Sequence, residues 1–374
     1  MKQHITLFFA LAIGVVLFNG KSSAQPTTTD STFKPHGVVS ALFFVDYFYK
    51  INGDSSAGSK GYYATTPKDF QAFDIRRVYL GYDYFFSPNI SASVLLAHEP
   101  AVAPGSPAAT GATAGGLLGD GTNGFYLKGA NVKIKGAIPM ATIIVGQQPT
   151  PAFQLSEMIW SYRSIEKTLL DFRGLEGSND IGVAVKGNFD NEGNFGYTAM
   201  ISNGANQKNE FNKFKKYFGE LFAMFLDKKI VVELVADENY TGAGSNDTNK
   251  AATLKGFVAL QLDPITIGVE YAGQNQTTEG KPNVTPGGLS VFARGPIMEK
   301  TLGFFARFDT WNPDQNTTDK GFNENFITAG LDWQPVSNVH IEPNVWIDSY
   351  KDKSSANTDR KADVAGRLTF YSKF

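Results

Sequence analysis

The stretch that decides the fold covers residues 147–179 and reads QQPTPAFQLSEMIWSYRSIEKTLLDFRGLEGSN. It is too long for a tight turn, and it carries bulky side chains and charges of both signs. Residues 141–146 before it and 180–187 after it alternate with period 2, which is typical of β-strands. Long connections between regular elements are usually functional. We therefore expect residues 147–179 to form a long loop between two strands, with a role of its own.

The rest of the chain repeats one unit: an alternating segment, a short turn, another such segment and a longer polar loop. The expected turns are rich in Pro, Gly, Asn and Asp, the residues that turns require, and they cover residues 87–89, 136–139, 190–193, 227–229, 263–264, 295–296 and 335–338. The expected long loops cover residues 51–69, 99–121, 147–179, 203–215, 239–250, 274–287, 311–323 and 351–359. Eight loops alternating with seven turns predict about 16 strands.

An even number of strands, with short turns at one end and long loops at the other, is typical of a bacterial outer-membrane barrel. The strands alternate an apolar face with a mixed one, as residues 230–237 do. Aromatic residues near strand ends match the girdles of such barrels at the two membrane interfaces. This set comprises Tyr47, Phe48, Tyr49, Tyr82, Tyr84, Phe85, Phe86, Trp311, Trp333, Phe370 and Phe374. The fold prediction is an all-β transmembrane antiparallel barrel over residues 36–374, with residues 147–179 folded inward to constrict it.

The N-terminal residues predict export. Residues 1–24 combine an early lysine, an apolar core over 5–18 and a small-residue cleavage site, which is typical of a secretory signal peptide. Residues 25–35 are Thr/Ser/Pro-rich and are expected to be a flexible lead. Removing the signal takes away Lys2 and Lys21 but no acid, so the net charge falls from −2 to −4. That near-neutral charge gives no basis for nucleic-acid binding, which needs a basic face.

Two short motifs resemble a known family. Residues 73–81, FDIRRVYLG, are similar to the second strand of the phosphate-selective porin O/P family, and residues 146–149, GQQP, followed by 155–173, resemble its constriction loop. The resemblance implies a 16-stranded passive channel in the outer membrane, usually a homotrimer, and some members prefer phosphate or other anions. The aromatic C-terminal residue, Phe374, resembles the signal that the outer-membrane assembly machinery recognises. The implied partners are small hydrophilic solutes, ions and outer-membrane lipid or lipopolysaccharide.

Charged residues of both signs are expected to line the pore. Alternation predicts basic wall residues at Arg77, Lys133, Lys135, Lys186, Lys255, Arg307 and Arg367, and acidic ones at Asp83, Glu220, Glu233, Asp237, Glu270, Asp309, Asp332, Glu342 and Asp348. Within the loop, Arg163, Lys167 and Arg173 are offset by Glu157, Glu166, Asp171 and Glu176. An anion filter needs Arg and Lys without compensating acids. The near balance therefore predicts a transverse field, with acids on one side and bases on the other, more than a strong phosphate filter.

Three local questions stay open at this level. The loop charges either filter solutes or only pair with one another and pin the loop to the wall. Residues 164–173, SIEKTLLDFR, either form a short helix with Glu166 and Lys167 on its exposed side or do not. Strict alternation places Arg76 and Arg77 on opposite faces, and we expect Arg77 to face the lumen.

No cofactor, metal or catalytic site is expected. Apart from the signal, the histidines are His36, His98 and His340, which are dispersed without a metal-ligand spacing and are expected at the surface. Two rival functions remain. A non-conducting adhesin or structural barrel predicts no conductance, and an outer-membrane enzyme needs a nucleophile and base, which three scattered histidines support poorly.

Overall fold

The computed structural model describes residues 33–53, 61–106, 122–240, 249–354 and 360–374. The predicted signal peptide, residues 25–32 of the predicted lead and most of the glycine-rich segment near residue 115 lie outside these ranges. The strands are β1 (His36–Asn52), β2 (Gln71–Phe85), β3 (Ile90–His98), β4 (Tyr126–Lys135), β5 (Ala141–Pro149), β6 (Asn179–Asn188), β7 (Phe195–Ser202), β8 (Lys216–Phe225), β9 (Ile230–Tyr240), β10 (Lys250–Gln261), β11 (Thr266–Thr277), β12 (Gly287–Met298), β13 (Leu302–Asn312), β14 (Phe322–Val336), β15 (Val339–Asp352) and β16 (Asp363–Lys373). Two helices, α2 (Gln154–Trp160) and α3 (Leu169–Phe172), lie between β5 and β6.

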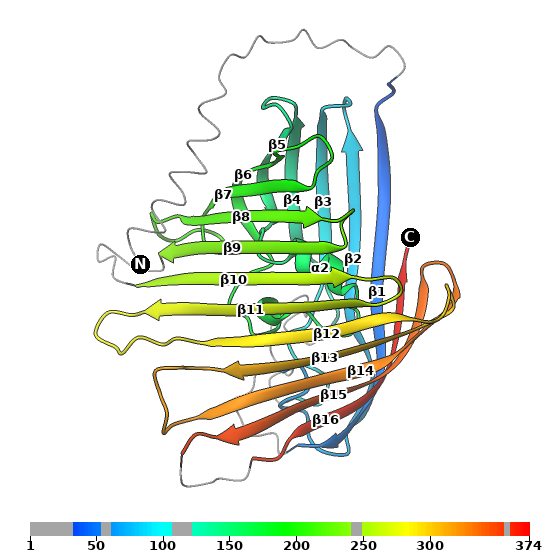
Figure 1. Cartoon of the computed structure of the whole chain (residues 1–374), viewed down its shortest axis with the longest axis vertical. Coiled ribbons are helices and arrows are strands. Elements are labelled where there is room, and N and C mark those ends of the chain that lie inside the picture. Colours follow the sequence, from blue (N-terminus) through cyan, green and yellow to red (C-terminus); the bar gives the residue numbers. More distant parts are fainter. Residues whose placement is uncertain (1–32, 54–60, 107–121, 241–248, 355–359) are drawn as a thin grey trace.

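The strands close into a single barrel (Figure 1). Each strand pairs antiparallel with its neighbours in the chain, and β1 also pairs with β16. At the closure Ala41 and Phe374 exchange two backbone hydrogen bonds of 2.9 Å. Closure removes the unpaired sheet edges that an open sheet would expose. The predicted 16-stranded antiparallel barrel is confirmed.

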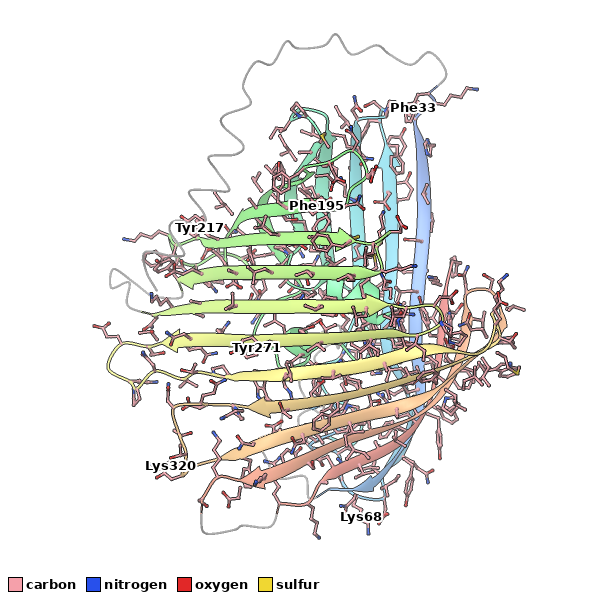
Figure 2. The ribbon with its side chains drawn as sticks, in the orientation of Figure 1. Phe33, Lys68, Phe195, Tyr217, Tyr271 and Lys320 are labelled. Atoms are coloured by element: carbon pink, nitrogen blue, oxygen red, sulfur yellow. The ribbon has the colours of Figure 1, made fainter. Side chains whose placement is uncertain are left out.

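The two faces of the barrel wall differ in polarity, as strand β9 illustrates. Its Val232 and Leu234 point outward and are 37% and 41% exposed, whereas Val231 and Val235 point inward and are buried. Tyr217 and Tyr271, labelled in Figure 2, also stand on the outer face. The outer face is therefore an apolar band, while the inner face mixes apolar and charged residues. No helix in the described part of the chain is long and apolar enough to span a membrane.

Two of the aromatic residues expected in girdles lie inside the barrel instead. Phe48 is fully buried and Trp311 is 7% exposed, and both belong to interior hydrophobic clusters. Tyr82, Phe86 and Trp333 are exposed as expected. Proximity to a strand end gives no information on the face to which a side chain points, because that depends on the parity of its position in the strand.

Six of the seven predicted short turns coincide with breaks between strands, and one is wrong. Residues 295–296 belong to β12, which continues to Met298 through a register shift between Pro296 and Met298. The turn follows at residues 299–301. Gly295 and Pro296 are turn-forming residues, but proline is also tolerated where a bulge interrupts the ladder.

Candidate functional site

Residues 150–178, named the inner loop from here on, connect β5 to β6 inside the barrel. Both ends of the loop meet at one neck. Pro149 pairs with Asn179 across the two strands, and Thr150 donates from its backbone to Ser178 O at 3.1 Å and from its hydroxyl to Gly177 O at 2.9 Å. The neck fixes where the loop leaves the wall. Figure 1 shows α2 lying inside the ring of strands.

The helices of the inner loop differ from expectation. The longer helix, α2, covers Gln154–Trp160, which was not predicted as helical. Within residues 164–173 only the four residues of α3, Leu169–Phe172, are helical, so Glu166 and Lys167 precede the helix. All apolar side chains of the two helices except that of Met158 face the wall, so packing against the barrel decides where the loop is helical more than local propensity does.

Apolar contacts hold the inner loop against strands β9 to β15. Leu155, Ile159, Trp160 and Ile165 pack on an inward-facing wall cluster formed by Val231, Phe257, Ala259, Phe292 and Phe305. A second cluster joins Ala152, Phe153, Leu169 and Leu170 to Val235, Ala272 and Trp311. Phe172 packs on Phe326 and Trp346. The barrel thus has a hydrophobic core on one side of its interior, and the loop forms half of it.

Basic side chains of the wall hold the backbone of the inner loop. They donate hydrogen bonds to its carbonyl oxygens: Lys255 to Ala152, Arg294 to Ile159, Arg76 to Ser164, Arg367 to Ile165 and Arg307 to Lys167. Charge-assisted bonds of this kind are stronger than neutral ones. Because these carbonyls lie outside regular helical bonding, the wall cations satisfy backbone groups that would otherwise be buried without partners.

Several residues predicted to line the pore are instead buried between the inner loop and the wall, where they pair with other protein groups. Arg307 is buried and forms an ion pair with Asp309 at 2.6 Å, beneath the loop, and Arg367 is equally buried. In the loop, Arg173 is 2% exposed and pairs with Glu324 and Asp348 of the wall. Glu176 pairs with Lys216, and Glu166 accepts a hydrogen bond from Trp346 Nε1 at 3.0 Å. For this group, the contacts agree with pinning, one of the two roles that the sequence left open.

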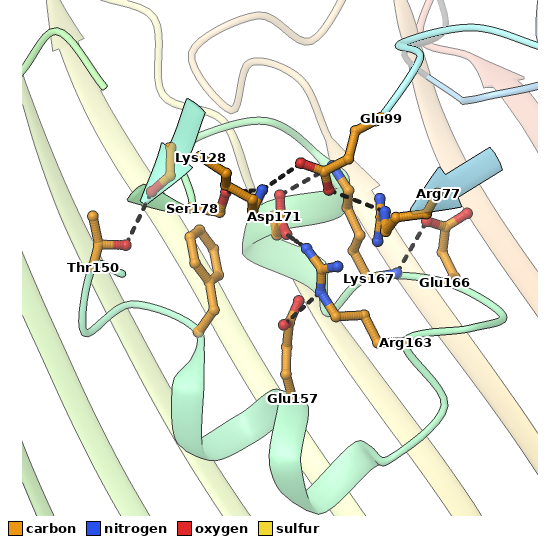
Figure 3. A network of polar contacts seen from close by, with 12 residues as sticks. Arg77, Glu99, Lys128, Thr150, Glu157, Arg163, Glu166, Lys167, Asp171 and Ser178 are labelled. Atoms are coloured by element: carbon orange, nitrogen blue, oxygen red, sulfur yellow. Dashed lines mark hydrogen bonds and ion pairs between the residues drawn. The ribbon is translucent and has the colours of Figure 1, made fainter. Parts of the chain in front are cut away.

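A second group of loop charges faces strands β2 to β4 across the interior (Figure 3). Arg163 lies between two acids of the loop, with Nε 2.7 Å from Glu157 and Nη2 3.3 Å from Asp171. Lys167 also reaches Asp171, at 3.2 Å. On the wall side, Glu99 forms an ion pair with Arg77, whose Nε lies 3.0 Å away, and it accepts hydrogen bonds from Lys128 and from the hydroxyls of Tyr79 and Tyr126. Arg163 Nη1 donates to Tyr79 at 3.0 Å and so links the two sides.

These two sides enclose a cavity of about 320 Å³. Its lining includes Arg77, Lys128, Lys167 and Asp171, together with residues of long loops such as Tyr62, Pro100 and Gln207. The cavity therefore lies on the long-loop side of the inner loop. The charges of both signs beside this cavity are named the cavity group from here on: Arg77, Glu99, Lys128, Glu157, Arg163, Lys167 and Asp171. A solute entering from the long-loop end would meet this part of the interior first.

The acids of this region differ in the direction in which their pKa values are shifted. Burial alone would raise the pKa of Glu99, but the charges of Arg77 and Lys128 outweigh it and hold the pKa well below its ordinary value. Asp171 behaves similarly, because Lys167 and Arg163 lower its pKa despite its burial. Burial raises the pKa of Glu157, with the nearby charge of Asp171 adding to the effect. Glu157 is thus the acid of the three that takes up a proton most readily.

Two β-bulges add basic side chains to the interior. In the pairing of β1 with β2, Phe44 lies opposite Arg77 and Val45 opposite Ile75, so Arg76 is an extra residue. Both Arg76 and Arg77 consequently point inward and are 5% exposed, which corrects the expectation that they lie on opposite faces. In the pairing of β3 with β4, Lys128 is the extra residue. Bulges re-aim side chains in this way.

Lysines on the wall form a third group. The register aligns Lys135 of β4, Thr142 of β5 and Lys186 of β6 in one row, and it aligns Lys133 with Ile144 and the buried Ala184 in the next row. Lys186 donates to Gln154 of the inner loop at 3.3 Å. Within the described ranges none of these three lysines has an acidic partner within ion-pair distance. They give this wall an uncompensated positive charge near the short-turn end.

Four residues of the site were not predicted from the sequence: Glu99, Lys128, Arg76 and Arg294. Lys128 precedes Gly129, and a glycine inside a strand is a signal for a bulge, so this residue could have been found. The histidine expectation holds for His36 only. His98 is 2% exposed and contacts the carbonyls of Gly124 and Ile75, and His340 points inward beside Asp332.

Known structures similar to this chain are bacterial outer-membrane porins. The anion-selective porin from Comamonas acidovorans superposes with a TM-score of 0.65 at 10% identity, over 91% of this chain and 100% of its own. The outer membrane channel DcaP of Acinetobacter baumannii gives 0.64 at 9% identity, over 92% and 99%. OmpF of Salmonella typhi, solved in complex with daunomycin, gives 0.60 at 12% identity, over 90% and 97%.

These identities show a shared fold. No protein-family model matches the sequence, and no curated protein matches it significantly. The resemblance to the phosphate-selective porin O/P family therefore stays a prediction, whereas the 16-stranded porin-type barrel is established.

Proposed function

We propose that this protein is an outer-membrane porin that forms a water-filled channel for passive diffusion of ions and small hydrophilic solutes. The observation that carries the proposal is a closed barrel with an apolar outer face, a charged interior and a loop packed inside it. Only helices and closed barrels satisfy every backbone group inside a bilayer. Polar groups along the interior lower the barrier because solutes keep polar partners throughout their passage.

The charges of the interior favour anions. Each acid of the cavity group has at least one cation within contact distance, as Glu99 has Arg77 and Lys128, and Asp171 has Arg163 and Lys167. Lys133 and Lys135 of β4 and Lys186 of β6 add positive charge without such partners. These lysines support a modest anion preference, while the transverse field expected from the sequence stays a prediction, because the cavity group places acids and cations next to one another. The resemblance to a phosphate-selective family and the name of the Comamonas porin point the same way.

Single-channel recording tests the proposal. The purified protein, reconstituted into planar bilayers, should give ohmic steps, and a salt gradient should give a reversal potential on the anion side. No conductance from correctly folded protein would contradict the channel and favour the adhesin or structural barrel. Cleavage of labelled lipid or peptide by the purified protein would favour the outer-membrane enzyme instead. The proposal also includes export by residues 1–24, assembly by the outer-membrane machinery, contact with lipopolysaccharide and a homotrimer.

Anion selectivity should rise as the pH is lowered from neutral, in the range where Glu157 takes up a proton. Glu157 has a raised pKa, so it becomes neutral at a higher pH than Glu99 and Asp171, whose pKa values are lowered. Its protonation removes one negative charge beside Arg163 and leaves the loop more positive. The measurement is the reversal potential in a fixed salt gradient at successive pH values.

Two variants identify the titrating group. Glu157→Gln should keep the reversal potential at the value that the wild type reaches at low pH, so the pH-dependent step in the reversal potential should disappear. Asp171→Asn removes an equal charge from the same loop and should keep the step but move it to lower pH, because the charge of Asp171 contributes to the raised pKa of Glu157. A step that persists in Glu157→Gln would assign the titration to another group.

A further inference from the structure

Three potential metal ligands meet inside the barrel, where β14 and β15 approach the short-turn end. Asp332 of β14 and His340 and Glu342 of β15 each place one ligand atom within 4.8 Å of the others. His340 Nδ1 is 2.9 Å from Oδ1 and 3.1 Å from Oδ2 of Asp332. Asp332 and Glu342 are 2% and 1% exposed. None of these residues belongs to the cavity group or to the contacts that hold the inner loop backbone.

One carboxylate oxygen of this group is unsatisfied. Glu342 Oε1 accepts a hydrogen bond from Ser164 Oγ at 3.0 Å, but Glu342 Oε2 is buried and has no hydrogen-bond partner among the described residues. Neither carboxylate has a lysine or arginine within ion-pair distance in the described ranges, and Asp332 pairs only with His340. A buried carboxylate without a cation is costly. The geometry thus provides two acids, one imidazole and a free oxygen atom.

We propose that Asp332, His340 and Glu342 bind one divalent transition-metal ion, with Zn²⁺ as the best fit. Zn²⁺ accepts imidazole nitrogen and carboxylate oxygen at about 2.0–2.2 Å, so tetrahedral ligand atoms lie about 3.4 Å apart. The contacts between His340 and Asp332, at 2.9 and 3.1 Å, have to lengthen by a few tenths of an ångström, and an ion would replace the hydrogen bond between them. The Glu342 carboxylate has to approach, and its free Oε2 loses no hydrogen bond when it does. Mg²⁺ prefers oxygen ligands alone, so it fits this donor set poorly.

The position of the site couples it to the inner loop. Tyr162 Oη donates to Asp332 at 3.3 Å and Ser164 donates to Glu342, so both carboxylates already contact the loop. A cavity of about 180 Å³, lined by Tyr162, Arg294 and Gln334, adjoins the group on the short-turn side. Gln334 donates to Asp332 at 2.8 Å. The three ligands lie behind Tyr162 and Gln334 and do not line this cavity, and a bound ion would fix the loop to β14 and β15. This would revise the expectation of a chain without a metal site.

The proposal is tested by metal titration. The folded, detergent-solubilised protein is first treated with a chelator and then titrated with the metal ion. Calorimetry with ZnCl₂ should give one site per chain, and Co²⁺ should give visible d–d absorption that Zn²⁺ abolishes and Mg²⁺ does not. His340→Ala and Glu342→Gln should each weaken Zn²⁺ binding at least tenfold. His36→Ala removes an exposed imidazole at the start of β1, away from the three ligands, and should bind like the wild type.

The result that overturns the site is equally definite. Absence of Zn²⁺ and Co²⁺ binding in the wild type would mean that a proton on one carboxyl satisfies the group instead. Wild-type affinity in folded His340→Ala and Glu342→Gln would also exclude the site. The heat-dependent gel shift of β-barrels reports whether each variant is folded. If a variant does not fold, anomalous scattering from a zinc-soaked wild-type crystal decides, because a peak between the three side chains supports the site and its absence there refutes it.

Discussion

Replacing Trp160 by alanine should lower the free energy of unfolding by about 3–5 kcal/mol, the range for truncating a buried aromatic residue. Trp160 is fully buried and its ring contacts Phe292, with centroids 4.9 Å apart, and Phe305. Its Nε1 donates to Glu166 O at 2.9 Å. The substitution therefore removes both the main apolar contact of the inner loop and a hydrogen bond within it. Denaturant titration in detergent or lipid measures the loss.

Met158→Ala is the matched control, because Met158 lies on the same helix and is 61% exposed. It should change stability by less than about 0.5 kcal/mol. We also expect single channels of Trp160→Ala to fluctuate between conductance levels, since a loosened loop can change the free cross-section. Equal stability of the two variants would show that the loop is held by its polar contacts alone.

The barrel and the bounds of its loops could be predicted because they depend on local signals. Period-2 alternation and turn-forming residues operate over fewer than about ten residues. The predicted loop at residues 203–215 fills the interval between Ser202, where β7 ends, and Lys216, where β8 begins. Glu99 was missed for a different reason, since nothing local indicates that a residue just beyond β3 turns toward Arg77 and Lys128.

Strict alternation predicted the wrong face for side chains at β-bulges, where one extra residue shifts the alternation of the strand. Arg76 and Lys128 each stand at such a bulge, and in both cases the result is an additional cation beside the inner loop. Two bulges on β2 and β4 thus concentrate positive charge on the side of the barrel that the loop leaves uncovered. A pattern read with a fixed period assigns these side chains to the lipid face.

Contacts between the loop and the wall could not be predicted because they join distant parts of the chain. Arg294 and Ile159 are 135 residues apart, and Arg367 and Ile165 are 202 apart. His340 and Asp332 are only eight residues apart, and their contact was missed for another reason, because it depends on the register of β14 and β15, which shifts between Trp333 and Val336. Charge counting alone treats all of these residues as pore-lining, although burial removes most of them from contact with a passing solute.

The charge reversal Lys133→Glu/Lys135→Glu/Lys186→Glu should change the sign of the reversal potential, from anion to cation preference. At 4 Å in water, one unit charge changes the energy of a monovalent ion by about 1 kcal/mol, so a reversal changes it by about 2 kcal/mol. Salt screens part of this effect, and we still expect a change in the permeability ratio of at least roughly tenfold. These lysines have no acidic partner within ion-pair distance in the described structure, so the substitutions break no ion pair.

A control with the same change in net charge separates a local field from total charge. Lys281→Glu/Lys300→Glu/Lys320→Glu alters three exposed lysines of the connections between strands, and Lys300 contacts only the neighbouring Glu299, at 3.9 Å. This variant should keep the wild-type reversal potential. If both triple variants shift it equally, surface charge governs selectivity. If neither variant shifts the reversal potential, the field of Lys133, Lys135 and Lys186 does not reach the path of the ions. The ion preference would then be set by Arg77, Lys128 and Lys167 of the cavity group.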